Sequence, residues 1–202
     1  MAGLHLGGMI RASDPRARNG WLTGQLLIAM PSMQDKRFVR TVICMCAHSD
    51  DGAMGLVLNR PLPKLQFDDL LKQLGVTPVP SARSIRMLAG GPVENGRGFV
   101  LHSGEWATDG TLPVAKDTRL TASIEVLKAI AAGEGPRDCV LALGYAGWGP
   151  GQVESEIASN AWLTVPAEPE LLYGTDPDKA WAAALSKLKV NPLALSSVAG
   201  RA

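Results

Sequence analysis

Hydrophobic residues along this chain gather in short runs, and glycine, proline or aspartate separates each run from the next. Apolar runs of about four to eight residues between turn residues are typical of strands in a buried sheet. In the first third of the chain they predict three strands, at residues 25–30, 39–47 and 55–59. Residues 48–53, rich in Asp and Gly, join the second run to the third, so we expect these two strands to form a hairpin.

The rest of the chain alternates between further apolar runs and segments of helical spacing. Four more strands are predicted at residues 85–89, 98–102, 139–145 and 162–165. Apolar positions three or four residues apart predict four helices, at residues 68–74, 121–132, 151–160 and 176–188. Asp68, Thr121 and Asp176 are the expected N-caps of three of them. Residues 104–118 have turn composition, which predicts a surface loop.

The order of these elements bears on the fold class. Strands come in runs of two or three separated by single helices, so a strict βαβ array is not supported. We therefore expect an α+β (mixed α/β) fold, a single domain whose mixed sheet folds back on itself. Residues 1–20 lack hydrophobic periodicity and are interpreted as a mobile N-terminal tail, which leaves residues 21–202 as the domain.

Composition excludes several classes of function. Lys and Arg number 20 and Asp and Glu 19, so the net charge of +1 offers no electrostatic footprint for direct nucleic-acid binding. Three cysteines do not make a secreted disulfide framework, and the N-terminal segment lacks the features of a signal peptide. No apolar run reaches the roughly 20 residues that span a bilayer. We expect a soluble, cytoplasmic protein that contacts no membrane.

A polar stripe on the third predicted helix is the first candidate for a site. Gln152, Glu156 and Asn160 recur at four-residue spacing and lie on one helix face. Trp148 and Trp162 stand just outside the helix ends, where they would wall a cleft beside the stripe. The alternative interpretation is a solvent-facing flank of an amphipathic helix, with both tryptophans used in packing.

The glycine-rich segment GYAGWGPG at residues 144–151 precedes this helix, at a place where phosphate-binding loops occur. It lacks the glycine spacing of the dinucleotide fingerprint and the Gly-Lys-Ser/Thr of the phosphate loop. Acidic residues in the following first turn would also repel a phosphate. A tight turn with close backbone packing is the better interpretation.

The cysteines and histidines suggest other chemistry. Cys44, Cys46 and His48 alternate along one strand, but side chains two positions apart start roughly 6.5–7 Å from each other, too far for one zinc ion. Core cysteines are the better interpretation, and no metal or other cofactor is predicted. His48 and His102 each stand at a strand end, where either a catalytic or a structural histidine is found.

Two strand ends carry further candidates. Asn59 and Arg60 close one strand, and Gly91 lies in a Gly-Gly-Pro turn after another. Arg60 is suited to a carboxylate or phosphate, although a structural ion pair or a backbone cap fits as well. Asp35 and Arg37 follow a strand that ends at Pro31 and are candidates for the same region, but spacing does not show that they converge.

These pieces together resemble the YqgE/AlgH family of bacterial proteins. The matching stretches are GQLLIAMP at residues 24–31, GAMGLVLNRP at 52–61, GGPV at 90–93, GFVLH at 98–102, GYAGWGPGQVE at 144–154 and NAWL at 160–163. The resemblance implies a bifurcated sheet curled into a partial barrel with flanking helices. It also implies the family's label of transcriptional regulator, with no established molecular activity.

We expect most a regulatory domain that binds a small molecule or a protein partner, with transcription affected indirectly. Its pocket would combine residues from strand ends with those around the third helix, namely Asn59, Arg60, Gly91, His102, Trp148, Gln152, Glu156, Asn160 and Trp162. The first alternative is a small-molecule hydrolase in which Glu156 and His102 act as a general acid–base pair. The second is direct DNA binding, against which the near-zero charge and the absence of a basic helix both argue.

Overall fold

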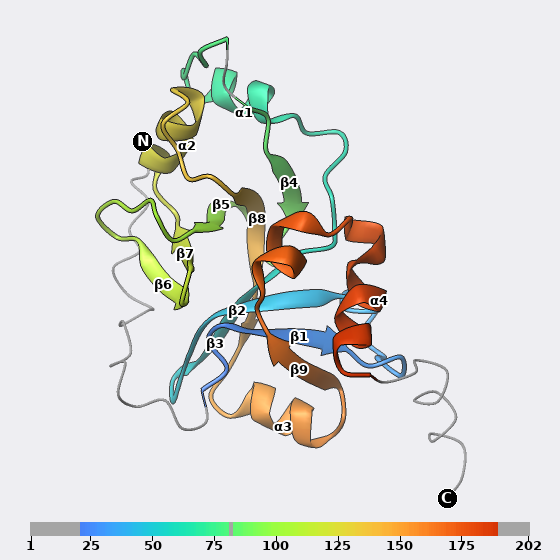
Figure 1. The fold of residues 1–202 in the computed structure, drawn as a ribbon. Coiled ribbons are helices and arrows are strands. Elements are labelled where there is room, and N and C mark those ends of the chain that lie inside the picture. The colour runs from blue at the N-terminus through green and yellow to red at the C-terminus, as the bar shows by residue number, and fades with distance from the viewer. Residues whose placement is uncertain (1–20, 81–82, 190–202) are drawn as a thin grey trace, which may run out of the picture.

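In the part of the chain that the structure describes, nine strands form the sheet that runs through the molecule (Figure 1). They are β1 (Gln25–Ala29), β2 (Val42–Ser49), β3 (Gly52–Val57), β4 (Arg86–Ala89), β5 (Val93–Ser103), β6 (Leu112–Ala115), β7 (Thr118–Thr121), β8 (Cys139–Trp148) and β9 (Trp162–Pro166). The order across the sheet is β6-β7-β5-β8-β3-β2-β1-β9, and β4 pairs with β8 outside this path. This computed structural model describes residues 21–80 and 83–189; the predicted tail, residues 1–20, lies outside them.

The sheet branches at β8. The first half of β8 pairs with the parallel strand β4, from Val140 to Leu143, whereas its last residues pair with the antiparallel strand β3. Gly144 lies between the two halves in the left-handed region, at φ 72°, and a Cβ there would stand 2.6 Å from the carbonyl oxygen of Gly91. Glycine alone fits such a conformation without steric cost. The branch point therefore depends on this residue.

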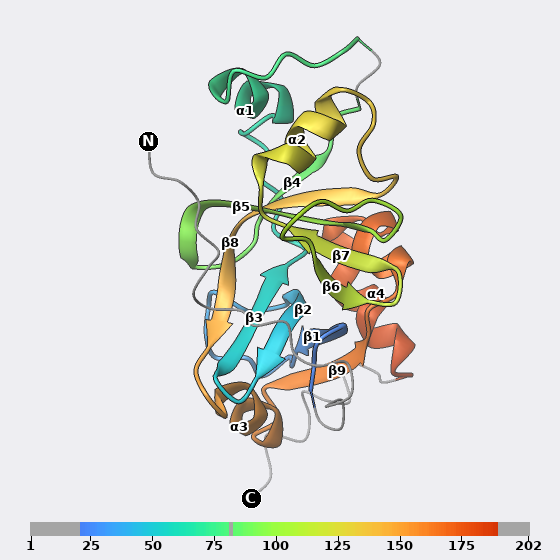
Figure 2. The same ribbon diagram turned by 90° about the vertical axis from the view of Figure 1, so that its left-hand side faces the viewer.

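Beyond the branch the sheet curls into a half-barrel around a hydrophobic core (Figure 2). Its inner face carries side chains from strands far apart in the order, including Leu26 on β1, Leu56 on β3 and Val114 on β6. These side chains are at most 5% exposed. Because burial of apolar area is the main driving force of folding, this shared core holds the curled sheet closed.

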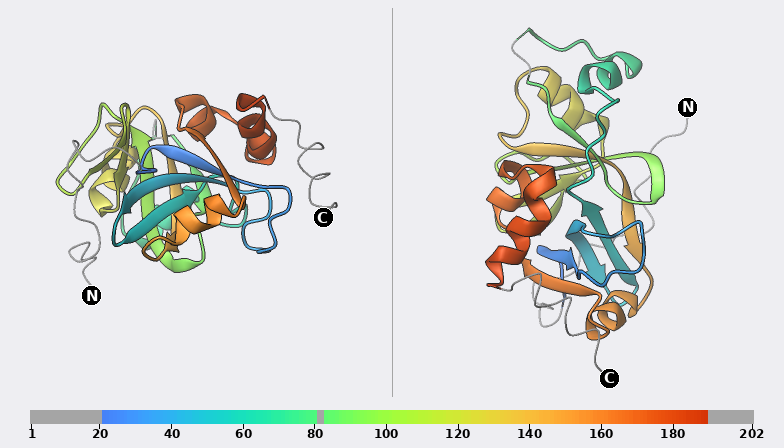
Figure 3. Two further views of the ribbon diagram at one scale, coloured as in Figure 1. Left: turned by 90° about the horizontal axis from the view of Figure 1, so that it is seen from below. Right: turned by 90° about the vertical axis from the view of Figure 1, so that its right-hand side faces the viewer.

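Among the described residues, four α-helices and one π-helical turn flank the sheet: α1 (Phe67–Gln73), α2 (Ile124–Ala131), α3 (Gln152–Ala158), η1 (Glu170–Gly174) and α4 (Pro177–Lys187). Helices α1 and α2 cover a second core at one end of β8, and α3 lies at the other end (Figures 1 and 2). Helix α4 and η1 pack on the main core beside β1 (Figure 3). In the described part of the chain, no helix has the length and apolar character to cross a bilayer.

The structure confirms the predicted fold class, a mixed sheet with flanking helices in one domain, and corrects several predicted bounds. Residues 104–118 were expected to form a loop, but β6 and the start of β7 lie there as a hairpin. The alternation of apolar and polar residues in β6 is short and interrupted by Pro113, so the sequence pattern did not predict a strand there. Thr121 belongs to β7, so the N-cap of α2 is Ser123; α1 begins before Asp68, after Gln66 as N-cap.

Two further bounds differ from the prediction. Strand β2 begins at Val42 rather than at residue 39, because residues 36–40 form turns. Strand β8 continues to Trp148, so the first part of the glycine-rich segment is strand rather than loop. The left-handed conformation at Gly144 allows β8 to bend there without ending. The N-cap role of Asp176 is confirmed, since its side chain accepts a hydrogen bond from the Asp178 backbone N–H.

Candidate functional site

The structure does not bring the predicted site residues into one pocket. Three of them lie near the branch of the sheet, Asn59, Arg60 and Gly91. Five surround α3, namely Trp148, Gln152, Glu156, Asn160 and Trp162. His102 lies opposite Cys139, at the far end of β8 from Trp148. Ten strand residues extend over roughly 30 Å, so His102 and Glu156 are far outside hydrogen-bond reach.

His102 is fully buried and both of its ring nitrogens are used. Nδ1 lies 3.0 Å from the carbonyl oxygen of Ser103, so it carries the proton and donates. Nε2 therefore accepts from the hydroxyl of Thr121, at 2.9 Å, and Thr111 donates in turn to Thr121. Burial lowers the pKa of His102. A neutral histidine with both nitrogens occupied is structural here and ties β5 to β7.

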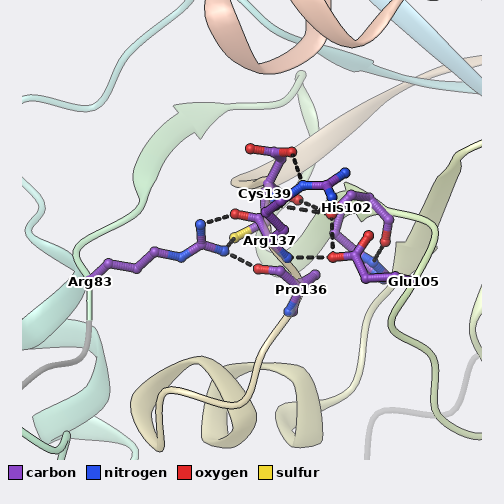
Figure 4. Close-up of polar contacts among 8 residues, drawn as sticks. Arg83, His102, Glu105, Pro136, Arg137 and Cys139 are labelled. Atoms are coloured by element: carbon purple, nitrogen blue, oxygen red, sulfur yellow. Dashed lines mark hydrogen bonds and ion pairs between the residues drawn. The ribbon is translucent and has the colours of Figure 1, made fainter.

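A polar network continues from His102 along the turn that precedes β8 (Figure 4). The carboxylate of Glu105 accepts from the hydroxyl of Ser103, at 2.7 Å, and from the backbone N–H of Arg137. Burial alone would raise the pKa of Glu105, but these hydrogen bonds lower it. Beside the network, burial raises the pKa of Cys139 to about 11, so its thiol stays protonated and unreactive at neutral pH.

At the other end of β8, Glu156 is the centre of what we call the Glu156 cluster, which consists of Trp148, Gln152, Glu156 and Trp162. Its Oε2 accepts from the indole N–H of Trp148, at 2.9 Å, and of Trp162, at 2.7 Å. Its Oε1 accepts from the Gln152 amide, whose own oxygen accepts from the backbone N–H of Gly149. The two indoles are nearly buried, so the carboxylate supplies their acceptor.

Asn160, the last residue of the predicted stripe, has a different role. It follows α3 with φ 58°, a left-handed conformation that asparagine tolerates better than most residues, and its N–H donates to the carbonyl of Ile157. It ends the helix. The sequence pattern therefore identified a real side-chain cluster that contains Gln152 and Glu156. Its polar groups hydrogen-bond each other and do not line an open cleft.

A histidine–carboxylate pair that we had not predicted lies next to this cluster. The backbone N–H of Leu22 donates to Nδ1 of His48, so Nε2 carries the proton and donates to Glu154 at 2.8 Å. The ring of Trp21 packs edge-on against the imidazole, with centroids 4.8 Å apart. Both nitrogens of His48 are occupied and its side chain is 1% exposed. The pair anchors α3 and the start of β1 on β2 and offers no free base.

A groove of about 660 Å³ opens at the branch of the sheet, and we call it the β3–β4 groove. Its lining is Arg37, Phe38, Val57, Arg60, Pro61, Leu62, Leu65, Ala89, Gly91, Pro92, Asn95 and Leu143. The floor comes from the ends of β3 and β4 and from β8, where the two strands part from their shared neighbour. Strands that diverge from a common partner leave a crevice, and sites for small molecules are typically concave.

Asn59, Arg60 and Gly91 shape this groove in different ways. Asn59 is buried; its amide oxygen accepts from the N–H of Val42 and its NH₂ donates to the carbonyl of Arg40, so it fixes the wall from behind. Arg60 is half-buried and lines the groove directly. A Cβ at Gly91 would stand 2.1 Å from the Tyr145 backbone, so only glycine allows this close approach of the turn to β8.

One aromatic contact joins the groove to the Glu156 cluster. Phe38 lies in the groove wall, and its ring meets that of Trp162 edge-on, with centroids 5.8 Å apart. Trp162 is in turn held by Glu156. Sequence reasoning had noted Asp35 and Arg37 near this place but missed Phe38, Leu62, Leu65 and Asn95. The sequence could have indicated these four residues only through their position near Pro31, Pro61 and Gly91, which mark the ends of predicted strands.

Among the residues that the structure describes, no three His, Cys, Asp or Glu side chains lie close enough together to hold a metal ion. Cys44 and Cys46 are buried thiols in the core of the half-barrel.

Comparisons with known proteins agree with this architecture. A family model described as AlgH-like matches residues 26–193. A UPF0301 protein from Azorhizobium caulinodans is 52% identical over 198 residues, covering 94% of this chain and 97% of that protein. Another, from Rhodospirillum rubrum, is 49% identical over 183 residues, covering 91% and 95%.

Two solved structures are also similar. The solution structure of the AlgH protein from Pseudomonas aeruginosa has a TM-score of 0.72 and 42% sequence identity, and the match covers 96% of this chain and 98% of that one. A crystal structure of a protein from Corynebacterium diphtheriae has a TM-score of 0.65, with 84% and 88% of the two chains covered. It is only 20% identical, so it shares the fold alone.

Proposed function

The chain belongs to the AlgH-like family, and on that premise we propose that it is a small-molecule-binding domain whose site is the β3–β4 groove. The names of the relatives described above state no reaction or ligand, so the geometry of the groove carries the proposal. The observation that supports the proposal is an opening of about 660 Å³, lined mostly by apolar side chains, at the branch of the sheet. Pockets for small molecules typically measure about 300–1,000 Å³ and have this kind of lining.

The polar groups of the groove support a binding role. Most buried polar side chains elsewhere in the described residues have partners in the protein, as His48 and His102 do. At the groove, the Asn95 side chain is exposed and makes no hydrogen bond with a described residue. Polar groups at the rim of an apolar groove orient a ligand, whereas the apolar floor supplies most of the affinity.

Two alternatives are less well supported. A hydrolase that uses Glu156 and His102 requires the two side chains in contact, and they lie at opposite ends of β8. Direct DNA binding requires a basic recognition element, yet α3 carries two glutamates and the longest helix, α4, mixes lysine with aspartate. We therefore propose that any effect on transcription follows from ligand or partner binding. The free thiols of the described cysteines support a reducing, cytoplasmic location.

The proposal is tested with N-phenyl-1-naphthylamine, a neutral apolar dye whose fluorescence rises on entering an apolar site. We expect saturable binding of one dye per chain. Leu65→Trp fills the groove and should abolish binding, whereas the matched Leu74→Trp, at the exposed C-cap of α1, should leave it unchanged. Equal binding to both variants, or no saturable binding to the natural chain, would overturn the proposal.

A further inference from the structure

We infer that the ligand of the β3–β4 groove is an amphipathic organic acid, whose single anionic group binds Arg60 and whose apolar body covers the groove floor. This inference rests on the proposed function and names its ligand class. It is drawn from a difference between the two arginines of the groove and from the chemistry of the floor.

The two arginines differ in how far their charges are neutralised. Arg37 forms three hydrogen bonds to the carboxylate of Asp35, the shortest 2.6 Å, so this pair carries no net charge. Arg60 forms no ion pair with any residue in the described ranges. Its contacts are with backbone carbonyls, that of Val39 at 2.5 Å and that of Asn59 at 3.5 Å. One uncompensated positive charge therefore remains at the groove.

Arg60 also has hydrogen-bonding capacity to spare. A guanidinium has five N–H donors in a planar fork, and the two carbonyl contacts use two of them. The remaining donors suit the paired oxygens of a carboxylate or a similar oxyanion, which arginine binds in two parallel hydrogen bonds. Because the side chain is half-buried, the charge is less screened than on the open surface.

The floor of the groove favours an anion with an apolar body over a purely polar anion. Val57, Leu62, Leu65, Ala89 and Leu143 all line it. Inorganic phosphate would pair with Arg60 but leave this surface in water, so it would gain nothing from apolar burial. A hydrocarbon chain or ring attached to the anionic group covers the same surface and gains affinity from each apolar group that it buries. The combination selects an acid with an apolar body.

A peptide strand is a poorer occupant than a small molecule. Peptides that extend a sheet need a free strand edge, and the outer edge of β4 is already occupied. The N–H of Leu62 donates to the carbonyl of Met87, and the N–H of Ala89 donates to the carbonyl of Arg60. The segment after β3 thus fills the position that an added strand would take, and only the groove between side chains remains open.

Two dyes that differ only in a sulfonate test the inference on the full chain. They are N-phenyl-1-naphthylamine, which is neutral, and 8-anilinonaphthalene-1-sulfonate, which carries one negative charge on the same ring system. We expect the sulfonate to bind about tenfold more tightly, as one charge-assisted contact provides. Arg60→Gln should remove this preference and leave the affinity for the neutral dye unchanged.

Matched variants distinguish a specific contact between Arg60 and the sulfonate from a general attraction of the anionic dye to positive charge. Lys64→Gln removes one positive charge from an exposed position nearby in the chain that does not line the groove, and the preference should persist. Arg60→Lys should keep part of it, because the charge remains but the fork is lost. If Arg60→Gln fails to fold, Arg60→Lys supplies the comparison. Loss of the preference in Lys64→Gln as large as in Arg60→Gln would contradict the inference.

Competition experiments then identify the ligand class. Octanoate should displace the sulfonate dye, whereas octylamine and inorganic phosphate at equal concentration should not. Displacement by phosphate as effective as by octanoate would show a simple anion site and refute the amphipathic acid. Equal affinity for the two dyes would refute the role of Arg60, yet leave the groove as a binding site; failure of Leu65→Trp to block either dye would refute the groove itself.

Discussion

The Glu156 cluster and the β3–β4 groove adjoin through Phe38 and Trp162, but they use their polar groups in opposite ways. In the cluster, the carboxylate of Glu156 accepts three hydrogen bonds from side chains of the protein. In the groove, Arg60 meets two backbone carbonyls and no described carboxylate. The cluster is closed and the groove is open.

This difference shows how to separate structural from ligand-binding polar residues. A buried group whose partners are all in the protein stabilises the fold, and its loss leaves those partners unsatisfied. A half-buried charge with spare donors adds little to the fold and keeps its capacity for a ligand. The two regions should therefore respond differently to substitution. Substitutions in the cluster should lower the free energy of unfolding, whereas substitutions in the groove should lower the affinity for a ligand.

The largest effect is expected from Glu156→Ala. The substitution leaves the indole N–H groups of Trp148 and Trp162 without their acceptor in a nearly buried site, at a cost of about 2–4 kcal/mol. Urea unfolding followed by tryptophan fluorescence measures it. Ser155→Ala, on the exposed side of the same helix, is the control and should change stability by less than about 0.5 kcal/mol. A loss from Glu156→Ala no larger than the control's would show that the cluster is not structural.

A smaller, pH-dependent effect is expected at His102, the other closed network. Its pKa is lowered mainly by burial, and by Arg119, against the raising effects of the Ser103 carbonyl and of Glu105. The unfolded chain therefore binds the proton more readily than the folded chain. Full stability is present above about pH 6.5, the usual pKa of histidine, and is lost as the pH falls through the lowered pKa.

The measurement compares unfolding free energies at pH 7.5 and pH 5. The natural chain should lose more stability over this interval than His102→Gln, which cannot titrate. If the variant does not fold, an NMR titration of the His102 ring in the natural chain replaces it. A His102 signal that titrates above pH 6.5 would contradict the buried, neutral assignment.

Glu154→Gln should have a still smaller effect. The carboxylate accepts from Nε2 of His48, but its side chain is 48% exposed, so solvent screens the pair. The amide oxygen of glutamine can still accept the hydrogen bond. We expect a loss below about 1 kcal/mol in thermal or urea unfolding. A loss equal to that of Glu156→Ala would mean that the His48 contact, rather than the indole contacts, holds α3 in place.

The smallest stability effect should come from Arg60→Gln in the open groove. Arg60 contacts the carbonyl of Val39, which is an exposed residue, so water can replace the guanidinium there and the change should stay below about 0.5 kcal/mol. The same variant should lose the dye preference described above. A large loss of stability would show that Arg60 belongs to the fold and would remove the contrast between the two regions.

The pattern of apolar runs predicted most of the strands and all four α-helices, because these elements are set by local periodicity. It failed where local signals were weak. The β6–β7 hairpin is short and interrupted by Pro113, and β8 continues past the predicted end at residue 145 to Trp148, where a glycine-rich turn was expected. In the second case the neighbours of β8 in the sheet, rather than local preference, decided the conformation.

The sequence by itself determined the elements, the mixed fold class and which polar side chains deserved attention, since these depend on residue type and spacing. Only the tertiary structure decided which of those side chains meet. Glu156 and His102 were predicted to share a pocket, but β8 holds them apart, whereas Arg60 and Leu143 line one groove because the sheet branches between β3 and β4. Such contacts depend on strand pairing across the chain, and no local pattern of residues encodes that pairing.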